Sequence, residues 1–194
     1  MNCGGLLPYT KARLEGRIKL PQVNTEPRPM TIAEKIIAKN TRNVLGDDGV
    51  IAVKPGDALI ARADKKYAYE LQTIISQQVL EETFGQVAPV NSDNVWVFED
   101  HLGLFPDDNP VTVRHRDAQR AFAEKYGIQE YRANRDGVEG ICHTVMLEKH
   151  VLPGELVLGN DSHTCELGAA NAFAVGKGAS EFAAALLTGD IPLK

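Results

Sequence analysis

Two short runs of β-forming residues constrain the fold more than any other feature of this chain. They are VWVF at 95–98 and LVL at 156–158, and both are apolar throughout. A compact run of this kind predicts a buried strand. Helical patterns separate the two runs, and strands that alternate with helices are typical of layered α/β folds. We therefore predict a three-layer α/β/α domain with a largely parallel sheet.

Helix signals precede both runs. Thr31 and Glu34 have the spacing of a capping box at the start of a helix, and apolar residues continue its face to position 37. Apolar residues at helical spacing predict a second helix over 67–84 and a third over 116–126. Each of these is closed by a glycine, at 85 and at 127, which is typical of a helix C-terminus.

The remaining segments are assigned more coarsely. Residues 1–29 carry four prolines and little periodicity, which predicts an N-terminal extension before an α/β domain at 30–194. Short strands are expected at 50–53 and 58–61, on either side of a Pro-Gly-Asp turn. The Ala- and Gly-rich stretch at 168–187 is expected to form a helix or a helix pair close to the sheet.

Charge and composition exclude several classes of partner. The formal net charge of -5 provides no overall basic field that would attract nucleic acid or an anionic membrane. The apolar stretches are too short to cross a bilayer, and the first residues lack the features of a secretory signal. The cysteines (Cys3, Cys142, Cys165) are odd in number and far apart, which argues against a disulfide framework. We expect a cytoplasmic protein with no nucleic acid and no membrane as partner.

Residues suited to acid–base chemistry follow both predicted strands. An Asp-His pair occupies 100–101, an Asp-Ser-His run occupies 161–163, and His143 lies on a third segment. Loops at the carboxyl ends of parallel strands carry the active groups in many α/β folds. A carboxylate beside an imidazole fixes its tautomer and raises its basicity, which suits proton transfer or the orientation of a metal ligand. Each Asp is also a common turn former or helix cap, so this structural alternative stays open for each pair alone.

Two longer motifs carry a resemblance to a known family. EGICHTV at 139–145 and LPGELVLGNDSHTC at 152–165 resemble the aconitase superfamily, in particular the large subunit of 3-isopropylmalate dehydratase and its homoaconitase relatives. MTIAEKI at 30–36, KPGD at 54–57, the Asp-His pair and GAANAFAVGKG at 168–178 fall in the same order as in that family. The resemblance covers about residues 30–194. It implies an aconitase-like N-terminal domain that is truncated at Lys194, where relatives continue.

The resemblance implies an activity and a set of site residues. Members of the family dehydrate and rehydrate a hydroxy di- or tricarboxylate, with one iron of a 4Fe–4S cluster acting on the substrate hydroxyl. Leucine biosynthesis is the implied setting. By likeness, Asp100 and His101 form one catalytic pair, Asp161 and His143 form a second, and His163 faces the hydroxyl. Ser162 would line the substrate pocket.

The chain departs from the family at the cluster ligands. Relatives use a lone cysteine followed much later by Cys-x-x-Cys, and this sequence has no Cys-x-x-Cys. Cys142 and Cys165 match positions that are not ligands in the family, so no ligand cysteine is identifiable. The cluster, the arginines for the substrate carboxylates and the catalytic base are expected from the remaining large-subunit domains and a small swivelling subunit. We expect the chain alone to be inactive.

A second departure concerns the substrate. Isopropylmalate-type relatives carry a His-Asp-x-Thr-Thr stretch where this chain reads YELQT at 69–73. Thr73 is the retained threonine, and Gln72 is able to hydrogen-bond a carboxylate, so both are candidate substrate-binding residues. The altered stretch leaves the identity of the hydroxy acid open.

Two other functions compete with the hydro-lyase. The first is a non-catalytic remnant of the same fold that binds a partner or a dicarboxylate without turnover, which the missing cysteines favour for the chain alone. The second is a mononuclear metal hydrolase that uses His101, His143 and His163. The complete set of Asp-His, Ile-Cys-His and Asp-Ser-His-Thr motifs favours the hydro-lyase.

Overall fold

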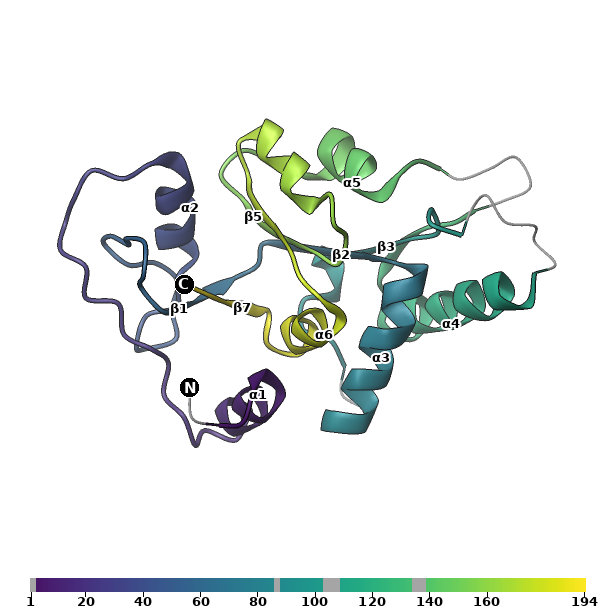
Figure 1. Cartoon of the computed structure of the whole chain (residues 1–194), viewed down its shortest axis with the longest axis horizontal. Coiled ribbons are helices and arrows are strands. Elements are labelled where there is room, and N and C mark those ends of the chain that lie inside the picture. Colours follow the sequence, from purple (N-terminus) through teal and green to yellow (C-terminus); the bar gives the residue numbers. More distant parts are fainter. Residues whose placement is uncertain (1–2, 86–87, 103–108, 134–138) are drawn as a thin grey trace.

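The computed structural model describes residues 3–85, 88–102, 109–133 and 139–194 and has an α/β fold (Figure 1). Within these residues, five strands form a sheet in the order β4-β3-β2-β5-β6, and every neighbouring pair is parallel. The strands are β2 (Lys65–Tyr69), β3 (Val95–Phe98), β4 (Gln129–Tyr131), β5 (Leu156–Gly159) and β6 (Phe173–Gly176). The predicted parallel sheet is confirmed.

Helical segments cover both faces of this sheet, which makes three layers (Figure 1). One face carries α3 (Glu70–Phe84), α4 (Pro110–Tyr126) and α6 (Ala179–Thr188). The other face carries α5 (Cys142–Val145), the π-helical turn η2 (Met146–His150) and the 3-10 helix η3 (Thr164–Ala170). A further short 3-10 turn, η1 (Ser92–Asn94), leads into β3.

The side chains of the buried strands alternate between two apolar clusters. In β3, Val95 and Val97 join the cluster that contains Leu80 and Phe122 from the helices α3 and α4. Trp96 and Phe98 join the opposite cluster, together with Cys142 and Met146. Successive side chains of a strand point to opposite faces, so a strand that is apolar throughout needs a covering layer on each side.

A smaller unit lies beside the main sheet and includes the N-terminal part of the chain (Figure 1). Its elements are α1 (Leu6–Leu14), α2 (Ile32–Asn40), β1 (Leu59–Arg62) and β7 (Asp190–Leu193). The strands β1 and β7 pair antiparallel. The buried carboxylate of Asp190 accepts hydrogen bonds from Arg13 of α1 and from Arg42, which follows α2. These bonds connect β7 to α1 and to the segment after α2.

Several predicted elements are confirmed. The helix α2 has the expected capping box, in which Thr31 and Glu34 satisfy each other's backbone N–H groups. The strand β3 has the predicted bounds, and β5 adds one residue to its predicted run. Gly85 and Gly127 end α3 and α4, each with a positive φ that disfavours other residues.

Three expectations need correction. Residues 67–69 belong to the central strand β2, because pairing with β3 and β5 on both sides overrides the helical spacing that continues into α3. Residues 50–53 form no strand, and the N–H of Val50 instead bonds to the carbonyl of Ala38 at the end of α2. Residues 173–176 form β6, so 168–187 is a mixed segment. Residues 1–29 contain α1, which contacts α6 and buries Tyr9 and Ala12, and the division at residue 30 stays a prediction.

No helix in the described ranges is long and apolar enough to span a bilayer.

Lys66 of the central strand β2 is fully buried. It lies near the end of β2 that is farther from α3 in the chain. Its Nζ has no hydrogen-bond partner among the described residues. Burial lowers the pKa of Lys66 from its usual value near 10.5 to about 8, against the opposing attraction of Asp190. A charged form therefore costs folding free energy at neutral pH.

We expect Lys66→Met to stabilise the protein at pH 7 and to flatten its pH dependence. As the pH falls from about 10.5 to 8, the unfolded chain takes up the proton before the folded chain does, so wild-type stability decreases over that window. The corresponding free energy is about 3 kcal/mol at most. Urea denaturation at pH 7, 8, 9 and 10 measures it. Lys35→Met, on the exposed surface of α2, is the control, and an equal response of both variants would contradict the prediction.

Candidate active site

The candidate site lies where β2, β3 and β5 end. These strands are neighbours in the sheet and run in the same direction, so their carboxyl ends meet at one edge. The loop after β3 carries Asp100 and His101, and the loop after β5 carries Asp161, Ser162 and His163. The short helix α5 adds Cys142 and His143.

The carboxylate of Asp161 is the centre of the site, with 1% of its side chain exposed. Its Oδ2 accepts the backbone N–H of His163 at 2.7 Å. The same oxygen lies 3.5 Å from Nδ1 of His143 and 3.9 Å from Nδ1 of His163, and Oδ1 lies 3.7 Å from Nε2 of His101. Three imidazoles therefore surround one buried carboxylate, at distances beyond ordinary hydrogen bonds but within strong electrostatic range.

Asp100 connects the β3 loop to α5. Its Oδ1 lies 2.8 Å from Nδ1 of His101, within hydrogen-bond range, and its Oδ2 accepts the backbone N–H of Cys142 at 2.6 Å. One carboxylate thus orients an imidazole and holds the start of α5 against the sheet. The structure brings together all five residues expected to be catalytic, and their roles stay predictions.

The histidines differ in access to solvent. The side chain of His163 is 59% exposed and that of His101 is 34% exposed, whereas that of His143 is 13% exposed. The rings of His143 and His163 stack with centroids 4.8 Å apart, and Nε2 of His143 lies 3.6 Å from a carboxylate oxygen of Glu166. His143 is therefore held from three sides, while the other two imidazoles face outward.

Two residues at the end of β2 support the site, although their roles were not predicted from the sequence. The ring of Tyr69 stacks on His101 with centroids 3.5 Å apart. The buried carboxylate of Glu70 accepts the backbone N–H groups of Asp100, at 3.2 Å, and Leu102. Burial raises the pKa of Glu70 and of Tyr69. Both residues lie in the YELQT stretch at 69–73, where the sequence differs from isopropylmalate-type relatives. That difference is the sequence feature that could have identified them.

A hydrogen-bonded layer lies beneath Asp161. The hydroxyl of the fully buried Tyr67 donates to Oγ1 of Thr164 at 2.9 Å. The hydroxyl of Thr164 in turn donates to the backbone carbonyl of Asp161 at 2.7 Å. Gly159 allows this approach, because a Cβ there would lie 1.9 Å from Oγ1 of Thr164. The glycine at the end of β5 is thus required by close packing.

The three residues expected to bind substrate lie in different settings. Ser162 is exposed, with Oγ 3.2 Å from Nδ1 of His163. Gln72 is half-buried and lies beside Tyr69, where it opposes the rise that burial causes in the pKa of that hydroxyl. Thr73 is buried, and its hydroxyl lies within hydrogen-bond distance of the carbonyl of Tyr69 and of Oε1 of Gln119. Thr73 therefore links α3 to α4 at this position.

The described cysteines do not fit a 4Fe–4S cluster by themselves. Cys142 is buried in the site, Cys165 is exposed on η3, and Cys3 lies near the N-terminus. Among the described residues, the side-chain groups close enough to share a metal ion are Asp100–His101–Cys142 and Cys142–His143–Asp161. Each group contains one thiol, that of Cys142, whereas the 4Fe–4S cluster implied by the family resemblance needs three. Neither group contains His163, so the three-histidine metal site gains no support.

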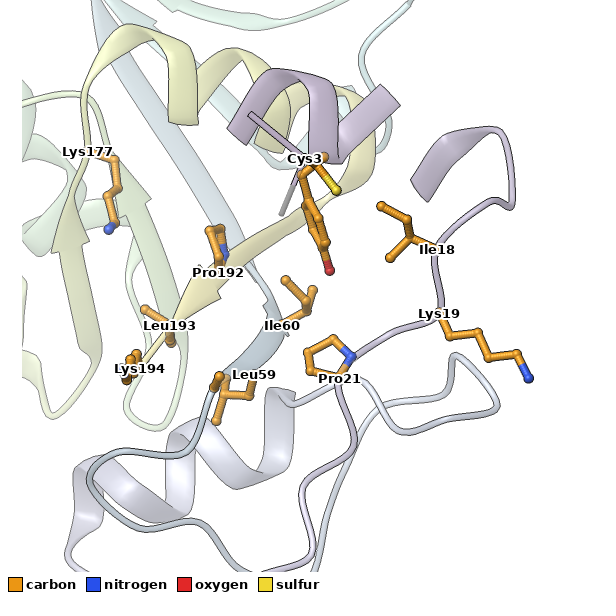
Figure 2. A pocket seen from close by; sticks show the side chains of 12 residues that line it. Cys3, Ile18, Lys19, Pro21, Leu59, Ile60, Lys177, Pro192, Leu193 and Lys194 are labelled. Atoms are coloured by element: carbon orange, nitrogen blue, oxygen red, sulfur yellow. The ribbon is translucent and has the colours of Figure 1, made fainter. Parts of the chain in front are cut away.

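A separate cavity of about 730 Å³ lies between the N-terminal segment and the β1–β7 pair. Figure 2 shows Ile18, Pro21, Leu59, Ile60 and Pro192 around it. None of the candidate site residues lines this cavity.

Comparisons with known proteins agree on one family. Residues 108–194 match the model of the aconitase family (aconitate hydratase). The chain is 35% identical over 162 residues to 3-isopropylmalate dehydratase large subunit 1 of Methanopyrus kandleri, which covers 83% of this chain and 35% of that protein. It is 33% identical over 170 residues to the methanogen homoaconitase large subunit of Methanocaldococcus jannaschii, which covers 85% and 36%. The chain thus spans about a third of the length of these relatives.

We expect Gly159→Ala to destabilise the protein by about 1–3 kcal/mol, because the added methyl group would displace Thr164 and break its hydrogen bond to Tyr67. Urea denaturation followed by circular dichroism measures the change. Gly168→Ala is the matched control, since a Cβ there meets no atom within 4 Å and the backbone has no positive φ. Equal stability of the two variants would show that the close approach at Gly159 is not a constraint.

Proposed function

Because the chain carries an aconitase-family domain over residues 108–194, we propose that it forms one wall of the active site of a hydro-lyase. The reaction is the isomerisation of a hydroxy di- or tricarboxylate by dehydration and rehydration. The observation that carries the proposal is the convergence of three imidazoles on the buried Asp161, beside the Asp100–His101 pair. An imidazole supported by a carboxylate is well suited to such proton transfers.

The pair at the end of β3 is suited to protonate a leaving hydroxyl. Hydroxide is a poor leaving group, so the C–O bond breaks more readily when the oxygen takes a proton and departs as water. Asp100 accepts the Nδ1–H of His101 and so fixes its tautomer, while the stacked ring of Tyr69 holds its plane. His101 then has its Nε2 free to give or take a proton on the side of Asp161.

The exposed fractions support a division of roles among the imidazoles. His163 and His101 are open enough to contact substrate, and His143 stands behind His163. When protonated, the three rings would offset the negative charge of the substrate carboxylates. Ser162 adds an exposed hydroxyl next to His163, and Gln72 adds a half-buried amide beside Tyr69.

The remainder of the proposed enzyme lies outside this sequence. A 4Fe–4S cluster in the complete enzyme would supply Lewis acidity, and its ligands would come from other polypeptide, as would the base and the arginines for the substrate carboxylates. Relatives named as large subunits support a small-subunit partner. By their names, 3-isopropylmalate or a homoaconitase substrate is the proposed hydroxy acid, with leucine biosynthesis in the cytoplasm as the proposed setting.

A chimera tests this proposal in an assembled enzyme. The matched segment of the Methanopyrus kandleri large subunit is replaced by this chain, and the product is combined with that enzyme's small subunit. Absorbance of the unsaturated intermediate reports dehydration of 3-isopropylmalate. We expect activity in the chimera, and we expect His101→Ala to lower kcat by a factor of about 10²–10⁴, because His101 is the group placed to protonate the leaving hydroxyl.

His115→Ala is the control for a histidine outside the site, because the described hydrogen bond of His115 goes to the carbonyl of Val111 in its own helix. It should retain the activity of the unmodified chimera. An assembled chimera that carries its cluster but fails to turn over, while calorimetry still detects 3-isopropylmalate binding, would favour the non-catalytic binding module. Unchanged kcat in His101→Ala would remove that residue from the mechanism.

A further inference from the structure

We infer that Cys142, His143 and Asp161 form a site for one thiophilic divalent cation of the Zn²⁺ class. The three side chains offer a sulfur, a nitrogen and an oxygen that all lie within 4.8 Å of one another. This set of ligands uses only residues of this chain. It differs both from a 4Fe–4S cluster, which needs three thiolates, and from a site built on three histidines. The inference does not depend on the proposed hydro-lyase.

The distances fit a tetrahedral ion. Bonds of about 2.0–2.3 Å to such an ion place neighbouring ligand atoms about 3.3–3.6 Å apart. Nδ1 of His143 and Oδ2 of Asp161 are 3.5 Å apart, which matches that edge length and is too long for an ordinary hydrogen bond. The ligand atom of Cys142 lies within 4.8 Å of those of His143 and Asp161, so it needs a movement of up to about 1.5 Å, a distance that a side-chain rotation covers.

The nitrogen in this position lacks another partner. Nδ1 of His143 is buried and makes no hydrogen bond to any described residue. A buried polar atom without a partner is costly, because it has lost water and gained nothing in return. An ion shared with Asp161 would satisfy it.

The charges of the three ligands suit a divalent cation. A thiolate and a carboxylate together carry two negative charges, and a neutral imidazole adds none. Burial, Asp100 and Asp161 raise the pKa of the Cys142 thiol, so the thiol is protonated in the absence of a cation. A bound cation would release that proton and neutralise both anionic ligands. The sulfur favours Zn²⁺ and Co²⁺ over Mg²⁺ and Ca²⁺, which prefer oxygen.

Surrounding groups contact all three ligands. Nε2 of His143 lies 3.6 Å from a carboxylate oxygen of Glu166. In metal sites, a carboxylate beside the ring nitrogen that does not bind the metal orients the histidine, and here that nitrogen is Nε2. The backbone N–H of Cys142 donates to Asp100 at 2.6 Å, and that of His163 donates to Asp161 at 2.7 Å. A ligand set supported in this way needs little reorganisation to bind.

Binding of cobalt to the reduced full chain tests the site, without reference to enzyme activity. We expect one Co²⁺ per chain, a near-ultraviolet thiolate-to-cobalt charge-transfer band, and displacement of that cobalt by one equivalent of Zn²⁺. Cys142→Ser should abolish the band. Cys165→Ser and Cys3→Ser are matched controls, because these thiols lie outside the ligand set, and both should retain it.

His143→Ala provides a second variant in case a serine in the buried position of Cys142 impairs folding. It keeps the thiol and should weaken cobalt binding by at least about tenfold. Circular dichroism establishes that each variant is folded. The inference is overturned if no charge-transfer band forms, if the band survives in folded Cys142→Ser, if it is lost in Cys165→Ser, or if His143→Ala binds cobalt as tightly as the wild type.

Discussion

The parallel pairing of β2 with both β3 and β5 is the constraint on which the candidate site depends. The register sets Tyr69 beside Phe98 and Tyr67 beside Gly159, so the start of α3 and the loops after β3 and β5 lie at one edge of the sheet. The N–H of Asn160 then continues the pairing by donating to the carbonyl of Tyr67 at 2.8 Å. A shift of one residue would turn every side chain of β2 to the opposite face and move Tyr69 away from His101.

Buried ionisable side chains lie near both ends of the central strands of this sheet. Glu70 and Asp161 lie at the carboxyl edge, and their oxygens accept backbone N–H groups of the neighbouring loops. These bonds offset the cost of removing a carboxylate from water. Lys66 lies near the opposite end of β2 without such a bond. The strand β2 therefore has a hydrogen-bonded carboxylate, Glu70, directly after its carboxyl end, and a lysine without a described hydrogen bond near its other end.

The two proposals use the same residues in different chemical states. Proton transfer in a hydro-lyase needs Asp161 and His143 free, whereas a thiophilic cation would bind both of them together with Cys142. If the hydro-lyase proposal holds, occupation by such a cation would oppose catalysis. Cys142 links the two states, since it lies in the motif shared with the family and contributes the only thiol to the described metal-ligand groups.

The sequence alone determined the strands β3 and β5, the capped helix α2 and the histidine motifs, because each depends on local patterns that read directly from neighbouring residues. It did not determine β2, since its residues Tyr67 and Tyr69 continue a helical spacing and become a strand only through pairing on both sides. The convergence of Asp100, His101, His143, Asp161 and His163 was expected from the order of the motifs. Their distances, the stacking of Tyr69 and the support from Glu70 were decided by the tertiary structure, because these contacts join segments separated by tens of residues and depend on strand order and register.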